Sequence, residues 1–266
     1  FIAEKTGCFN RVVLLTMIKL LMLFATLVTS YQVVAIGNLT NTHFSSAQTS
    51  EPMVVGYIEF QPLYGTVNNQ PQGILVDITR KVFDELSLDY KERVMPTKRL
   101  FTSLKKGRIQ IWCGIKINEL QDHIWSGSEV LHQLSLNLYT LSEQINITEK
   151  ADLKGKKVIL LMGYDYGGWG QYIRNKENGV TFIDVKSHED ALRLLRTGRY
   201  QYLLNYRAPM NIALTQLPTP ELKHSNINEL PIVFNVTKNM ANAKQLLTQL
   251  DNTLAKLIKT GQIAIQ

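Results

Sequence analysis

A helix that ends at a glycine and leads directly into a strand occurs twice in the chain, with similar residues each time. The stretch Leu-Lys-Lys-Gly-Arg-Ile-Gln-Ile at 104–111 is echoed by Leu-Arg-Thr-Gly-Arg-Tyr-Gln-Tyr at 195–202. Glycine readily closes a helix because it adopts the left-handed conformation at little cost. The repeat therefore predicts two α/β units of one architecture. A chance similarity between two helix–glycine–strand junctions is the alternative.

Apolar periodicity extends this alternation of strands and helices along the chain. It predicts helices from the apolar spacing within 75–86, 97–106, 189–196 and 246–257, and a further helix from about 169. Between them, short apolar runs predict strands at 53–58, 90–95, 109–115, 134–138, 158–162, 180–185, 200–205 and 232–236.

Length and composition limit the class of protein. The 266 residues are 45% hydrophobic and 19% charged, which suits one large or two small domains and excludes a disordered chain. Two cysteines are too few for a disulfide scaffold, and we expect Cys113 to be a buried, unreactive thiol. The net charge of +7 is spread along the chain, so we expect no nucleic-acid partner.

The N-terminal segment has the pattern of an export signal. Met17 is a plausible start, Lys19 supplies a positive charge, an apolar stretch follows at 20–28, and small residues around Ala35 offer a cleavage site. We expect residues 1–35 to be a signal peptide, 36–51 to be a flexible lead-in and the mature protein to be periplasmic. A retained membrane anchor is the alternative.

Several short motifs then stand in a recognisable order. They are Phe60 and Pro62 followed by Gly-Ile-Leu-Val-Asp-Ile at 73–78, the helix ending at Gly107, Leu-Lys-Gly-Lys-Lys-Val at 153–158, the turn at Gly163, and the closing helix with Gly261. In this order and spacing, the chain resembles the extracellular solute-binding proteins of family 3, the amino-acid-binding type. The resemblance covers nearly all of residues 53–262.

The resemblance implies a fold and a function. The implied fold is α/β, a two-lobed periplasmic binding protein of type II with two hinge crossovers, here near 133–136 and 231–234. Lobe 1 would be residues 52–132 plus 232–266, and lobe 2 residues 133–231. A Venus-flytrap clamp would capture a small polar, amino-acid-like ligand for an ABC transporter, with a membrane permease or sensor as partner. We expect a monomer without enzymatic activity, cofactor or metal.

Ligand in such a sheet binds beyond the carboxyl ends of parallel strands. The loops at these ends supply the candidate ligand-binding residues, whose aromatic faces and few polar groups suit a small polar molecule. Backbone N–H groups before the helix at 169 are also candidates for holding an anion, with a plain tight turn as the alternative. The candidates are Glu59, Phe60, Tyr64, Gly114, Ile115, Lys116, Tyr164, Asp165, Gly167, Gly168 and Asn205.

The sequence departs from the family's amino-acid site in two places. The stretch 116–125 has no arginine to clamp an α-carboxylate, and Lys116 or His123 lacks the planar fork of a guanidinium. The acid expected to receive the α-amino group falls near Asn205, which is neutral. The ligand is therefore left open by the sequence.

Two other functions stay open as alternatives. A dehydratase-like enzyme on the same scaffold would need an acid–base pair, for which Glu59 with Lys116 or Asp165 is the candidate set. The histidines have no HExxH spacing, and no GxSxG turn occurs, which argues against a metalloenzyme or a serine hydrolase. A ligand-sensing module that signals to a membrane partner is the second alternative.

Overall fold

The structure is a computed structural model that describes residues 52–142 and 146–265. The predicted signal peptide at 1–35, the start at Met17, the cleavage near Ala35 and the lead-in at 36–51 lie outside the described residues. Within the described residues, no helix has the length and apolar character needed to cross a membrane.

One group of strands contains the first predicted α/β unit. Strand β1 pairs in parallel with β4 on one side and with β5 on the other, and the end of β11 pairs antiparallel with β5 and β6. Helices α2 and α7 contact each other beside these strands. The group consists of β1 (Met53–Tyr57), α2 (Ile74–Glu85), β4 (Tyr90–Val94), α3 (Thr97–Lys105), β5 (Ile111–Gly114), β6 (Ile124–Ser126) and α7 (Ala243–Lys259).

A second group contains the repeated unit. Strand β8 pairs in parallel with β9 and with β10, which pairs antiparallel with β7. This group consists of β8 (Lys157–Leu161), α4 (Trp169–Arg174), β9 (Thr181–Val185), α5 (His188–Arg196), β10 (Tyr202–Tyr206) and α6 (Arg207–Gln216). Short 3-10 helices are η1 (Asn118–Leu120), η2 (Lys150–Leu153) and η3 (Lys176–Asn178).

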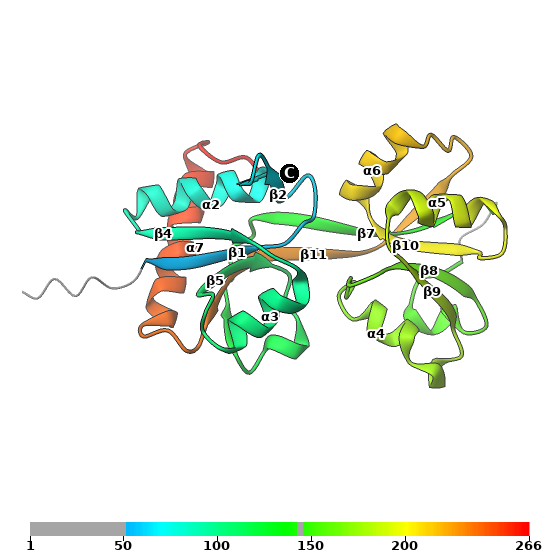
Figure 1. The fold of residues 1–266 in the computed structure, drawn as a ribbon, viewed down its shortest axis with the longest axis horizontal. Helices are drawn as coiled ribbons and strands as arrows, with labels where there is room; N and C mark the ends of the chain where they lie inside the picture. Colours follow the sequence, from blue (N-terminus) through cyan, green and yellow to red (C-terminus); the bar gives the residue numbers. More distant parts are fainter. Residues whose placement is uncertain (1–51, 143–145, 266) are drawn as a thin grey trace, which may run out of the picture. The chain divides into compact units, whose positions relative to one another are not determined.

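Two long antiparallel strands connect the groups. Strands β7 (His132–Thr140) and β11 (Lys223–Thr237) pair with each other along the whole of β7, with a bulge between Asn226 and Asn228. Figure 1 shows both running from the first group to the second. The strand order is β4-β1-β5-β11-β7-β10-β8-β9, with β6 also on β11.

Most predicted elements are present within a residue or two of their expected ends, and the exceptions have physical reasons. Helix α6 is not among the predicted helices. Pro209 is its third residue, where the missing N–H costs no hydrogen bond. The hairpin of β2 (Gly65–Val67) and β3 (Gln70–Gln72) is not among the predicted strands. Its turn residues Asn68 and Asn69 have φ of 50° and 58°, as a two-residue hairpin turn requires. The predicted strand 232–236 is part of the longer β11.

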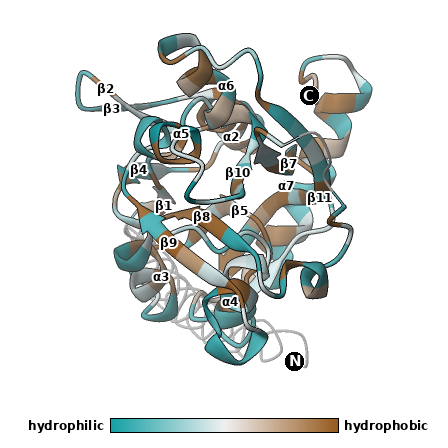
Figure 2. Cartoon of the chain, turned by 90° about the vertical axis from the view of Figure 1, so that its right-hand side faces the viewer, coloured by the Kyte–Doolittle hydropathy of each residue, from teal (hydrophilic) through white to brown (hydrophobic). Residues whose placement is uncertain are grey.

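The helices bury one face each. In Figure 2 brown hydrophobic and teal hydrophilic residues share the same helices, as expected of amphipathic helices that cover a sheet. Helix α7 buries a stripe at helical spacing that includes Leu250 and Leu254, both 0% exposed. On β5, the thiol of Cys113 lies 3.2 Å from Thr79 Oγ1, and burial raises its pKa to about 12. The thiol is therefore protonated at neutral pH, as expected of an unreactive cysteine.

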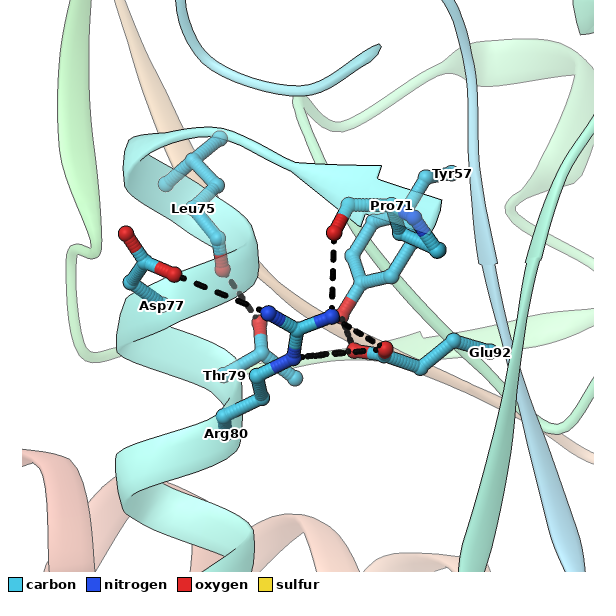
Figure 3. A network of polar contacts seen from close by, with 7 residues as sticks. All are labelled: Tyr57, Pro71, Leu75, Asp77, Thr79, Arg80 and Glu92. Carbon is cyan, nitrogen blue, oxygen red and sulfur yellow. Dashed lines mark hydrogen bonds and ion pairs between the residues drawn. The ribbon is translucent and has the colours of Figure 1, made fainter. Parts of the chain in front are cut away.

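An ion pair ties α2 to β4 in the first group (Figure 3). Arg80 Nη2 donates to Glu92 Oε2 at 2.6 Å, and its Nε donates to Oε1 at 3.1 Å, which is the forked geometry that guanidinium and carboxylate favour. The hydroxyl of Tyr57 donates to Glu92 Oε1 at 3.3 Å, and Arg80 Nη2 also donates to the carbonyl of Pro71 at 3.0 Å. The network fixes α2 and therefore the loop that precedes it.

Candidate ligand-binding site

A pocket lies where the loops of the two groups of strands meet at the strands' carboxyl ends. It holds about 530 Å³ of space, counted with its opening to solvent. Its lining comes from β5, α3, β7, β11 and the loops or ends of β1, β8 and β10. The lining residues are Ile58, Phe60, Tyr64, Thr97, Phe101, Trp112, Ile115, Ile117, Leu134, Gly163, Tyr164, Asp165, Tyr206 and Ile232.

Aromatic rings connect the two groups across this pocket. Phe60, in the loop after β1, has its ring centroid 5.4 Å from that of Tyr164 and 5.4 Å from that of Tyr206. Tyr164 and Tyr206 are 5.6 Å apart, and Phe60 also packs against Tyr64 at 6.1 Å. The pocket is thus walled by aromatic side chains from both groups.

The wall formed by β5 combines an indole and a glycine. Trp112 and Gly114 are two residues apart on a strand and therefore lie on the same face. A Cβ on Gly114 would lie 2.5 Å from Trp112 Cη2 and closer still to Cζ2 and Cε2. The indole therefore lies over Gly114, and only glycine leaves room for it. Trp112 is 2% exposed, and its Nε1 is a buried donor without a hydrogen-bond partner among the described residues.

The tyrosine hydroxyls of the pocket stay protonated at any physiological pH. Burial raises the pKa of Tyr164 to about 12 and raises those of Tyr64 and Tyr206 further. The carboxylate of Asp165 adds to the rise at Tyr206. These hydroxyls are neutral donors and acceptors, with no charge to offer a ligand.

Tyr164 is also contacted by His188, which is in turn hydrogen-bonded to Asn205. His188 accepts a hydrogen bond on Nδ1 from Asn205 Nδ2 at 2.8 Å, and its Nε2 lies 3.4 Å from the hydroxyl of Tyr164. Asn205 is 0% exposed, and its Oδ1 accepts from the backbone N–H of Tyr206 at 2.9 Å. Burial lowers the pKa of His188, so the ring is neutral and Asn205 supports the aromatic wall.

The loop after β8 contains Asp165, the carboxylate in the pocket lining. Asp165 lines the pocket, and its Oδ2 accepts a hydrogen bond from the backbone N–H of Gly168 at 3.0 Å. The amide of Gly168, a candidate for holding an anion with a plain tight turn as the alternative, is thus bonded within the loop. A Cβ on Gly167 would meet the side chain of Leu230, so this glycine provides close packing against β11.

Five of the predicted residues come together at the pocket: Phe60, Tyr64, Ile115, Tyr164 and Asp165. The other six lie outside its lining. Glu59 accepts from Thr66 Oγ1 at 2.6 Å and lines a neighbouring hollow with His188 and Pro209, and Lys116 is exposed. Gly114, Gly167, Gly168 and Asn205 support the walls instead. The acid–base set of Glu59 with Lys116 or Asp165 is therefore not assembled in this pocket.

Sequence reasoning missed several lining residues, chiefly Tyr206, Thr97, Phe101 and Leu134. Tyr206 follows Asn205 directly, but all five residues of β10 are buried, so alternation along this strand carries no signal of which face a residue takes. Among the described residues, no cluster of three or more His, Cys, Asp or Glu is placed to hold a metal ion.

The fold is that of an α/β binding protein, and the described structure has a pocket between its two groups of strands. The sequence pattern of the bacterial extracellular solute-binding proteins, family 3, matches residues 53–265, and the chain belongs to this family. The structure matches the periplasmic binding protein type II fold, as predicted. No curated protein matches the chain.

Solved structures support the fold. A histidine kinase sensor domain with similarity to periplasmic binding proteins is 22% identical, with a TM-score of 0.64, covering 80% of this chain and 92% of that one. An ancestral arginine-binding protein bound to arginine is 20% identical (TM-score 0.60; 79% and 93% covered). The arginine-, lysine-, histidine-binding protein ArtJ from Geobacillus stearothermophilus is 19% identical (TM-score 0.60; 80% and 91% covered).

Proposed function

We propose that the chain is a non-enzymatic solute-binding protein that holds a small ligand in the aromatic pocket and delivers it to a membrane transporter. The observation that carries the proposal is the pocket itself, which both groups of strands line at their carboxyl ends. Membership of the family supports it, since the family and the similar structures are binding proteins.

The mechanism follows from the connections between the groups. We propose that they are lobes with limits at 52–132 plus 232–266 and at 133–231, and that β7 and β11 act as the hinge. Phe60 on one side and Tyr164 and Tyr206 on the other are the surfaces that would close on a ligand. Rotation about two strands opens and closes such a site without disturbing either core.

Delivery rather than sensing is the finer part of the proposal. A sensor domain is among the similar structures, so signalling to a membrane partner is the second candidate function. Neighbouring genes separate the two: a permease and an ATPase support delivery, whereas a histidine kinase or a cyclase supports sensing. In either case we propose a periplasmic location and a monomer.

A thermal-shift screen of the full chain tests solute binding. The compounds are amino acids, amines, small peptides and organic acids. A ligand present at 100 times its Kd should stabilise the fold by about 2.7 kcal/mol, which raises the Tm by several degrees. Gly114→Ala, which displaces the indole that lines the pocket, should reduce the shift. A screen in which no compound raises the Tm contradicts the proposal.

A further inference from the structure

The charged side chain in the pocket lining is an acid. Within the described structure the lining carries the carboxylate of Asp165 and no lysine, arginine or histidine. A carboxylate of a ligand would lose its water there, meet no cation and be repelled by Asp165. A positively charged group would meet that carboxylate and the π faces of the surrounding rings, which attract cations.

The pocket also has one unsatisfied donor. Trp112 Nε1 is buried and has no hydrogen-bond partner within residues 52–142 and 146–265, although buried polar groups in folded proteins are almost always bonded. An indole N–H only donates, so its partner must be an acceptor. The residue lines the pocket, and a ligand with a neutral oxygen or nitrogen acceptor would satisfy it.

The backbone N–H groups of the loop after β8 do not replace a cationic side chain as a binding site for a carboxylate. Its amide at Gly168 already donates to Asp165, and helix α4 behind it has only six residues. Asp165 Oδ2 therefore uses the backbone N–H of Gly168, and the other carboxylate oxygen, Oδ1, is left for a ligand. The charge of the pocket lining is therefore negative, the opposite of what an anionic ligand needs.

We propose, on the basis of the proposed solute-binding function, that the pocket takes a small organic cation that carries a neutral hydrogen-bond acceptor and no carboxylate. The cation lies among the rings of Phe60, Tyr164 and Tyr206 and faces Asp165. The acceptor lies on Trp112 Nε1. Amides and esters of amino acids and small hydroxylated amines have this chemistry, whereas free amino acids do not.

Matched compounds test whether the pocket prefers a cation without a carboxylate. Isothermal titration calorimetry of the full chain at about pH 6.5, where an α-amine is largely protonated, compares L-phenylalaninamide with L-phenylalanine and with N-acetyl-L-phenylalaninamide. L-Argininamide and L-arginine form a second pair. We expect each amide to bind at least about tenfold more tightly than its acid, and the acetylated, uncharged amide to bind about tenfold more weakly than the free amine.

Two variants assign the effect to residues. Asp165→Asn keeps an oxygen for the N–H of Gly168 but removes the charge, so it should reduce the preference for the cationic amide to about twofold or less. Asp122→Asn removes an equal charge from an exposed turn and should leave all affinities unchanged. Trp112→Phe removes the donor and should weaken both amides by about tenfold.

The outcomes separate the inference from the function on which it rests. Tighter binding of the amides that depends on Asp165 supports the inference. Tighter binding of an acid than of its amide overturns the inference while solute binding stands. Binding of none of these compounds also overturns the inference, and the thermal-shift screen then decides whether solute binding fails too.

Discussion

The substitution Gly114→Ala tests the shape of the pocket through a single methyl group. The new Cβ would lie 2.5 Å from Trp112 Cη2, whereas ordinary contacts begin at 3.4 Å, so the indole must move by about 1 Å or more. Overpacking of this kind costs about 1–3 kcal/mol. Loss of the glycine's freedom in the unfolded chain returns about 0.4–1 kcal/mol, because φ at 114 is not in the left-handed region.

The net expectation is a loss of about 1–2 kcal/mol, which lowers the Tm by roughly 2–8 °C for a chain of this size. Ligand affinity should fall by about tenfold or more, because the displaced ring lines the binding space. Thermal denaturation followed by circular dichroism measures the first effect, and calorimetric titration with the compound that most stabilises the wild type measures the second.

A double-mutant cycle assigns the cost to the indole. In the background of Trp112→Leu, the atoms that the new methyl group would meet are gone, so Gly114→Ala should cost less than about 0.5 kcal/mol. An unchanged Tm and affinity in the single variant, or the same cost in both backgrounds, would refute the described contact between Trp112 and Gly114.

Three further predictions concern stability. Arg80→Met should cost about 1–3 kcal/mol in urea denaturation, because it leaves Glu92 without its forked partner; a loss within about 0.5 kcal/mol would show the pair to be energetically idle. Leu254→Ala should cost about 2–5 kcal/mol by the same assay, since the side chain is fully buried; a smaller cost would place it outside the core. Burial lowers the folded-state pKa of His188, so the unfolded chain takes up its proton first and stability should fall as the pH drops below about 6.5. The fall in stability should level off below the folded-state pKa of His188. It should be smaller in His188→Gln, in which only the contribution of His132 remains, because burial lowers the pKa of His132 as well. An identical fall in stability in the variant would contradict this prediction.

The repeated helix–glycine–strand junction was a reliable guide to the fold for a local reason. Gly107 and Gly198 both have a positive φ, 68° and 71°, and each follows an amphipathic helix. Such a junction depends on residues adjacent in the sequence, so the sequence alone determines it. Among the elements that the apolar patterns do not predict, α6 has Pro209 at its third position, and the β2–β3 hairpin has strands of only three residues each around the turn at Asn68 and Asn69.

The site was less predictable because it depends on which face each residue takes. The loops after β1 and β8 were correctly expected to meet, and they bring Phe60 and Tyr164 into contact. Asn205 and Tyr206 are neighbours in a fully buried strand, and only the tertiary structure places the amide on His188 and the ring in the pocket. The support of Trp112 by Gly114 likewise depends on side-chain packing that apolar patterns do not encode.

The most direct test of the central claim is a crystal structure of the chain grown with the compound that most raises its Tm. The account predicts ligand density enclosed by Phe60, Tyr164 and Tyr206, within hydrogen-bond distance of Trp112 Nε1. Ligand density at any other place on the molecule, with this pocket holding only water, would contradict it.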